Sequence, residues 1–213
     1  MNNFKKILLA LALISLFSCK AQVVAPDSND EVIIPMSNTQ AEIPDNAYLK
    51  DTTNELNKYI GTWKYQSGNE SLTIILDKFL HYDFDAYFKD ILIGEYKYVD
   101  ATGATIINSL PDMTDSAVDP LEHNISSAVF IHKGQYPKCS ECGVTEFRIK
   151  SFFEDPERPM VPMAIVFRYI SPTQIKAKIV QAGNSLTLEG EPSEIRIPFF
   201  TTEGFIEYTL NKI

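Results

Sequence analysis

Two cysteines separated by two residues, Cys139 and Cys142 in "PKCSECG", are the residues whose types and spacing best suit chemistry. A disulfide between them would remove about 2 kcal/mol of denatured-state entropy in the chain-entropy model. A redox pair would require the first thiol at a helix N-terminus, which lowers its pKa. Pro137 before the pair and "GVTEFRI" after it instead indicate a β-turn. The spacing therefore favours a local disulfide over a redox pair.

A metal site is the third alternative for these cysteines, with His132 or His123 as further ligands. Structural zinc usually takes a second pair of ligands at similar spacing, and the sequence has no such pair. We therefore expect the disulfide, and neither a metal nor another cofactor.

The stretch "PDMTDSAVDPLEH" gathers carboxylates without the spacing of an EF-hand loop, so it predicts a solvated acidic loop. The carboxylates are Asp112, Asp115, Asp119 and Glu122. Two short strings, "DTT" at Thr52 and "DSA" at Ser116, resemble the acceptor pattern for O-glycosylation in Bacteroidota.

Catalytic motifs are missing from the sequence, which has no G-x-S-x-G, no H-E-x-x-H and no phosphate-binding glycine loop. The histidines at 81, 123 and 132 are scattered, without a nucleophile at a known spacing. We therefore expect a protein that is not an enzyme. The formal net charge of −9 repels phosphate backbones, which disfavours nucleic acid as a partner.

The N-terminal stretch has the layout of a secretory signal, with Lys5 and Lys6 before an apolar run from Ile7 to Phe17. A helix of that length rises only about 16 Å, about half the hydrocarbon core of a bilayer. "LFSC", ending at Cys19, resembles the bacterial lipobox, where a signal peptidase cuts before a lipid-modified cysteine.

Acyl chains on Cys19 would then hold the protein to a membrane, each buried methylene contributing about 0.8 kcal/mol. Lys20 follows, and by resemblance to bacterial lipoprotein sorting the lack of Asp there favours the outer membrane, without fixing the periplasmic or the surface face. The resulting organisation is a signal peptide over 1–18, a lipidated flexible tether over 19–50 and a single barrel domain over 51–213. Within the tether, "EVIIP" could pair as an edge segment.

Alternating apolar and polar residues predict antiparallel strands with one wet face over most of the domain. Gly-Asn turns in "QSGNE" and "QAGNS" predict two hairpins. The expected strands cover 62–66, 71–76, 91–99, 104–108, 126–133, 145–153, 163–170, 174–180, 185–189 and 194–200. A short helix with a Thr52–Glu55 capping box should precede them and end at Gly61.

Gly61-Thr62-Trp63, at the start of the first strand, resembles the signature of the lipocalin and fatty-acid-binding (calycin) barrels. The resemblance implies that Gly61 permits a tight bend and that Trp63 plugs the barrel base. It also implies a late-strand arginine stacked on the tryptophan, with Arg196 the first candidate and Arg168 the second. The expected fold is all-β: an antiparallel lipocalin-like barrel of about 8–10 strands.

"YLKDTTNELNKYIGTWKY" and "ILIGEYKY", behind "CKAQ", resemble a family of Bacteroidota lipoproteins whose domain has no assigned function. The calycin resemblance implies a barrel that binds a small apolar or amphipathic ligand. One alternative is a structural or interaction lipoprotein of the cell envelope with an unknown protein partner. Another is a metal- or stress-sensing lipoprotein that uses the CxxC pair.

Overall fold

The computed structural model describes residues 31–38, 42–156, 159, 161–182, 200–201, 204–205 and 207–213. Val32–Ile213 forms one compact unit. No helix in these ranges is long and apolar enough to cross a membrane. The elements are β1 Ile33–Pro35, β2 Tyr48–Lys50, η1 Leu56–Lys58, β3 Gly61–Ser67, β4 Glu70–Asp83, β5 Phe88–Val99, β6 Thr105–Asn108, η2 Leu110–Thr114, β7 Ile125–Ile131, β8 Arg148–Phe153, β9 Met163–Ser171, β10 Gln174–Gln181, β11 Phe200–Thr201, β12 Gly204–Phe205 and β13 Glu207–Lys212.

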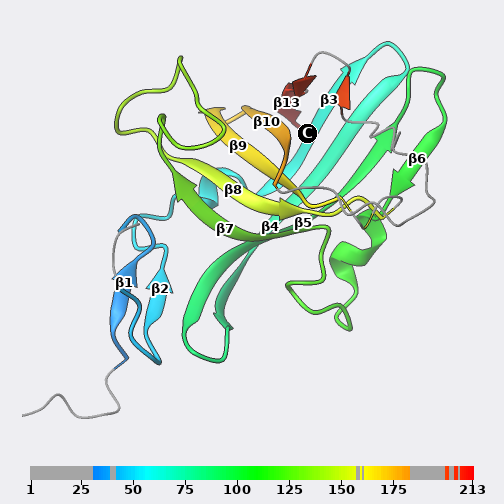
Figure 1. Cartoon of the computed structure of the whole chain (residues 1–213). Coiled ribbons are helices and arrows are strands. Elements are labelled where there is room, and N and C mark those ends of the chain that lie inside the picture. Colours follow the sequence, from blue (N-terminus) through cyan, green and yellow to red (C-terminus); the bar gives the residue numbers. More distant parts are fainter. Residues whose placement is uncertain are drawn as a thin grey trace, which may run out of the picture. The chain divides into compact units, whose positions relative to one another are not determined.

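Eight antiparallel strands form a closed barrel, in the order β5-β4-β3-β13-β10-β9-β8-β7, with β7 pairing back onto β5. Figure 1 shows these strands running side by side around one core. The all-β, lipocalin-like barrel expected from the sequence is therefore confirmed. Short η1 and η2 turns are the only helical elements among the described residues.

Alternation along the strands places one set of side chains inside the barrel. On β10, Ile175, Ala177 and Ile179 are fully buried, whereas Lys176 and Lys178 lie on the outer face. Large aromatic side chains fill the centre, as in small barrels packed by their own residues. The largest fully buried ones are Trp63, Tyr59, Tyr96, Tyr208, Phe130 and Phe167. The barrel interior is therefore occupied by core side chains.

The barrel closes at one glycine. Gly94 of β5 is the only residue of that strand paired with β7, opposite Ile125. A Cβ atom at Gly94 would lie 2.5 Å from the carbonyl oxygen of Ile75 and 2.7 Å from Cδ2 of Leu76. The three strands β4, β5 and β7 can approach this closely because residue 94 has no side chain.

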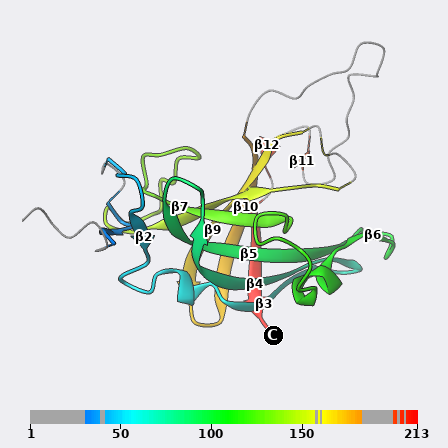
Figure 2. The ribbon, with the colours of Figure 1, turned by 90° about the horizontal axis from the view of Figure 1, so that it is seen from below.

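The same edge of β5 also pairs with two further strands, one on each side of Gly94. β6 pairs with the Lys97–Val99 end, and β2 pairs in parallel with Phe88 and Lys89. Figure 2 shows β6 and the η2 turn at one end of β5. β5 is therefore the strand at which the barrel, its N-terminal extension and the β6 hairpin meet.

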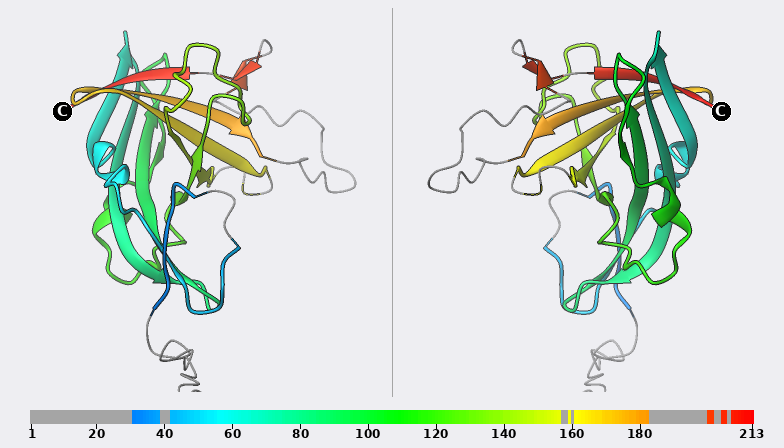
Figure 3. Two further views of the ribbon diagram at one scale, coloured as in Figure 1. Left: turned by 90° about the vertical axis from the view of Figure 1, so that its left-hand side faces the viewer. Right: turned by 90° about the vertical axis from the view of Figure 1, so that its right-hand side faces the viewer.

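The segment that carries β1 and β2 belongs to the barrel unit, so the boundary expected at residue 51 moves back to Val32. β1 pairs with β2, which confirms the expected pairing of "EVIIP". The buried carboxylate of Asp90 accepts hydrogen bonds from the Tyr48 hydroxyl and the backbone N–H of Asp51. Figure 3 shows the β1–β2 segment beside the β4–β5 hairpin. Hydrogen bonds to a buried carboxylate thus fix part of the expected tether.

Two local expectations need correction. Asp51, not the Thr52–Glu55 capping box, caps the η1 turn, because its carboxylate accepts the N–H groups of Glu55 and Leu56 at 2.8 and 2.9 Å. β13, which the sequence analysis did not predict, pairs with both β3 and β10 and is needed to complete the barrel. The strand expected at 185–189 lies outside the described residues, as do residues 194–199 of the strand expected at 194–200 and residues 183–185 of the "QAGNS" turn.

Candidate functional site

Trp63, which was expected to plug the barrel base, is buried beside a lysine of the last strand. Trp63 is fully buried and donates its indole N–H to the carbonyl of Tyr59 at 2.6 Å. Lys212 of β13 holds its ammonium 5.1 Å from the indole centroid and donates to the carbonyl of Ile60 at 3.0 Å. Gly61 has φ +126°, which L side chains rarely adopt. Lys212 thus joins the last strand of the barrel to the turn before the first.

Neither arginine candidate is seen at this tryptophan. Arg196 lies outside the described residues. Arg168 lies on the outer face of β9, where its Nε donates to Glu146 at 2.7 Å and another of its nitrogens lies 3.4 Å from Glu141. The ion pairs with Glu146 and Glu141 raise the pKa of Arg168. Arg168 therefore links the loop that carries Cys139 and Cys142 to strand β9 of the barrel.

Cys139 and Cys142 form a disulfide, which confirms the preferred sequence interpretation. Arg148, whose guanidinium is buried, also holds the loop around them. It donates to three backbone carbonyls, those of Pro137, His132 and Gln135, at 2.6, 2.8 and 3.2 Å. Desolvation lowers the pKa of Arg148. The loop is a rigid external feature with several independent anchors.

The two histidines considered as metal ligands lie in unrelated surroundings. His123 is bonded to Glu95, and the His132 ring packs 4.7 Å from the Phe147 ring. Among the described residues no group of three or more His, Cys, Asp or Glu side chains is arranged to hold a metal ion. With both thiols in the disulfide, a metal alternative would require reduction first.

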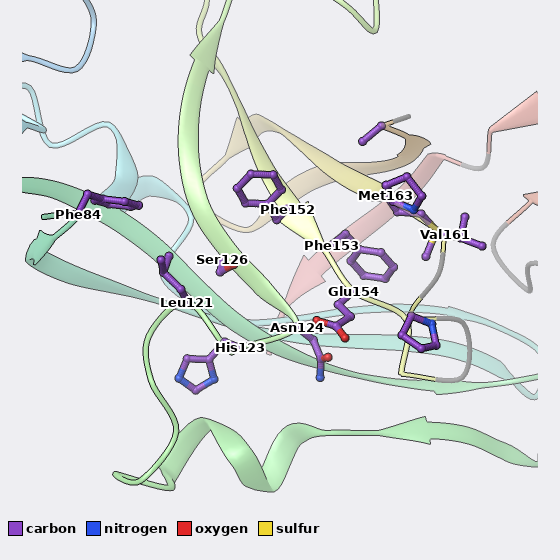
Figure 4. Close-up of a pocket in the computed structure, with 13 residues that line it drawn as sticks. Phe84, Leu121, His123, Asn124, Ser126, Phe152, Phe153, Glu154, Val161 and Met163 are labelled. Atoms are coloured by element: carbon purple, nitrogen blue, oxygen red, sulfur yellow. The ribbon is translucent and has the colours of Figure 1, made fainter. Parts of the chain in front are cut away.

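A groove of about 590 Å³ runs along the outer surface near the open ends of β7, β8 and β9, and we call it the rim groove. Figure 4 shows Phe84 and Leu121 at one end, and Val161 and Met163 at the other. Its lining residues are Phe84, Leu121, His123, Asn124, Ser126, Phe152, Phe153, Glu154, Pro159, Val161, Pro162, Met163 and Ala182. The groove combines apolar walls with a few polar groups, as ligand pockets usually do.

A buried carboxylate fixes the polar part of this groove. Glu95 is 1% exposed and lies on the outer face of β5. Its Oε1 lies 2.8 Å from Nδ1 of His123, and its Oε2 accepts a hydrogen bond from the side-chain amide of Asn124 at 2.7 Å. With the carboxylate as acceptor, Nδ1 of His123 donates, and the Nε2 side of the ring is left for a ligand. The arrangement can therefore orient a polar group at a defined place in an apolar groove.

Hydrogen bonds to Asp119 stabilise the acidic loop over 111–123, which borders the rim groove. Asp119 accepts the Tyr82 hydroxyl and the N–H of Leu121, both at 2.9 Å. A second hollow of about 520 Å³ shares Asn124 with the rim groove and reaches Asp112 and Glu122.

Other residues singled out from the sequence lie apart from the groove. Thr52 and Ser116 are both exposed, as glycan acceptors would need to be. Cys19 lies outside the described residues.

The sequence analysis did not identify the Glu95–His123–Asn124 cluster. His123 appeared there as a scattered histidine, and Glu95 as a charged residue within the alternating stretch "ILIGEYKYV". The one available signal was a glutamate flanked by apolar residues in a long strand. That signal cannot identify its partner, because the partner arrives from a loop about 28 residues later.

Comparison with known proteins places the chain in a family. A model described as a family of unknown function (DUF6705) matches residues 1–202. No curated protein and no solved structure matches this chain.

Proposed function

We propose that this chain, which belongs to the DUF6705 family of unknown function, is a lipid-anchored, non-catalytic binding protein of the cell envelope. Its ligand is a small amphipathic molecule held in the rim groove. The observation that carries the proposal is the groove of about 590 Å³, within the usual size range of small-molecule sites, with His123 and Asn124 fixed by a buried carboxylate.

Packing supports a site on the rim more than one in the barrel interior. Trp63, Tyr96, Phe130 and Phe167 occupy the interior, and removing them would cost several kcal/mol each. The groove needs no such rearrangement, because its walls already stand apart. Phe152 is 67% exposed, an arrangement that leaves a large ring in water until something covers it.

Lipid attachment at Cys19, outer-membrane location and contact with the membrane through the lipid remain part of the proposal, supported by the lipobox and the signal layout. Cys19→Ala should abolish incorporation of labelled fatty acid and move the protein into the soluble fraction. A variant that still partitioned with lipidated protein in detergent would contradict the anchoring.

Ligand binding is tested by native mass spectrometry on the full-length protein, recovered from its natural envelope in detergent. Extra mass, released on denaturation, is expected for the wild type. Phe152→Asp should lose that mass, whereas Val144→Asp should keep it, because Val144 is 81% exposed and does not line the groove.

An interaction protein is the second candidate, favoured by a different surface. Val129, Tyr136 and Phe152 are exposed around an outer hollow of about 580 Å³ on β7 and β8. Wild-type protein that carries no extra mass and co-purifies with one other protein in stoichiometric amount would favour this candidate. Such a result would contradict the small-molecule proposal.

A further inference from the structure

A small hollow opens where β5 and β7 separate beyond Gly94, and we call it the seam pocket. Its volume is about 150 Å³, the space of roughly five water molecules. Apolar side chains line it from two directions. They are Ile34, Met36 and Leu49 from the N-terminal segment, and Ala128, Val129 and Phe130 from β7.

One cation lies in this apolar wall. Lys89 of β5 lines the seam pocket and is partly buried, with its backbone paired to Leu49 of β2. No hydrogen bond or ion pair from its ammonium to any described residue is present, and the other lining residues carry no charge. Asn38 supplies the only other polar side chain of the pocket.

This arrangement is unfavourable in the empty protein. Desolvation by burial lowers the pKa of Lys89 to about 8. Arg168, another part-buried cation, is by contrast paired with Glu146 at 2.7 Å. An anion that entered the seam pocket would supply the missing countercharge, and a charged group is costly to bury only while it is unpaired.

We propose that the seam pocket binds a short-chain aliphatic carboxylate, with the head group on the Lys89 ammonium and the tail against the apolar walls. A single ammonium matches a monoanion, and the net charge of −9 on the chain disfavours a ligand of higher negative charge. The small volume excludes a long acyl chain. This site shares no residue with the rim groove and does not depend on it.

Calorimetric titration of hexanoate into the chain starting at Lys20, at pH 7, tests the proposal. Lys89→Met should weaken hexanoate binding about tenfold or more, because it removes a charge-assisted hydrogen bond and keeps the stem. Lys138→Met, at an exposed position that does not line the seam pocket, should leave the affinity unchanged. Hexanol should bind the wild type about tenfold or more weakly than hexanoate does.

Equal hexanoate affinity in the wild type and Lys89→Met would overturn the proposal, as would no saturable binding or equal affinity for hexanol. Phe152→Asp should bind hexanoate like the wild type. If Phe152→Asp lost hexanoate binding and Lys89→Met kept it, hexanoate would bind in the rim groove, which would also refute the seam-pocket proposal. The Lys89 ε-methylene signal gives a readout that does not depend on folding stability. Its apparent pKa should rise when hexanoate is present.

Discussion

Replacing Gly94 by alanine should destabilise the barrel more than a single methyl group usually does. The new Cβ would lie 2.5 Å from the Ile75 carbonyl oxygen and 2.7 Å from Cδ2 of Leu76, where real Cβ atoms essentially never come. The Leu76 methyl can rotate away, but the Ile75 oxygen belongs to a strand held by neighbours on both sides. The strand backbones must therefore move apart.

The size of the effect follows from this geometry. Overpacking a core by one methyl group costs about 1–3 kcal/mol, and a backbone clash belongs at the upper end, near 3 kcal/mol. For a domain of this size that corresponds to a fall in Tm of about 6–12 °C. The change should also weaken the one β5–β7 pair, so the amide protons of β7 around Ile125 should exchange faster than those of β9.

Urea unfolding followed by circular dichroism measures the difference, with Gly134→Ala as the matched control. A Cβ at Gly134 would meet nothing within 4 Å, so that variant should be neutral or about 0.4–1 kcal/mol more stable. A Gly94→Ala protein within about 0.5 kcal/mol of the wild type would refute the reasoning, because it would mean that the strands adjust without cost.

Three further predictions concern the base, the loop and the seam. Lys212→Met should lower the free energy of unfolding in urea by about 1–2 kcal/mol and shift the Trp63 fluorescence. Lys212→Arg should keep both properties near the wild type. Equal stability of Lys212→Met and the wild type would contradict the proposed role of the lysine. Replacing Cys139 and Cys142 with serine should lower the stability by no more than about 2 kcal/mol, since Arg148 holds the same loop; global unfolding on reduction would contradict this. The folded-state pKa of Lys89 is lowered to about 8 from an ordinary 10.5, so between these values the unfolded chain binds more protons. Wild-type stability should therefore rise relative to Lys89→Met as the pH increases from about 8 to 10.5, and a flat difference across that window would contradict the burial of the lysine.

The barrel could be predicted from the sequence because its strands alternate and its turns are marked by glycine and asparagine. Alternation on β10, where Lys176 and Lys178 separate three apolar residues, has a single structural meaning. β13 shows the same pattern in Tyr208 and Leu210, but over a stretch short enough to be overlooked. Strand order and closure depend on which edges meet, and the sequence of one strand does not specify its neighbour.

The candidate site was less accessible to prediction, for a physical reason. Its polar groups act only through partners that are distant in the chain, as Glu95 does with His123. The position of Lys212 over Trp63 shows the same limit, since stacking over an indole requires a cation at a given place and not a particular residue type. By contrast, Cys139 and Cys142 are close in sequence, and their bond was predicted from spacing alone.

The pairing of β3 with β13 affects the order in which the chain can fold as it is made. One edge of β3 finds β4 at once, through a tight turn at Gly68. The other edge must wait for β13, since the Lys212 ammonium and the Ile60 carbonyl that it reaches are 152 residues apart in the chain. During that interval the β3–β4–β5 meander presents an unpaired, half-apolar edge to whatever surrounds it. Chaperones that shield strand edges should therefore matter more for the yield of this protein than for its final stability.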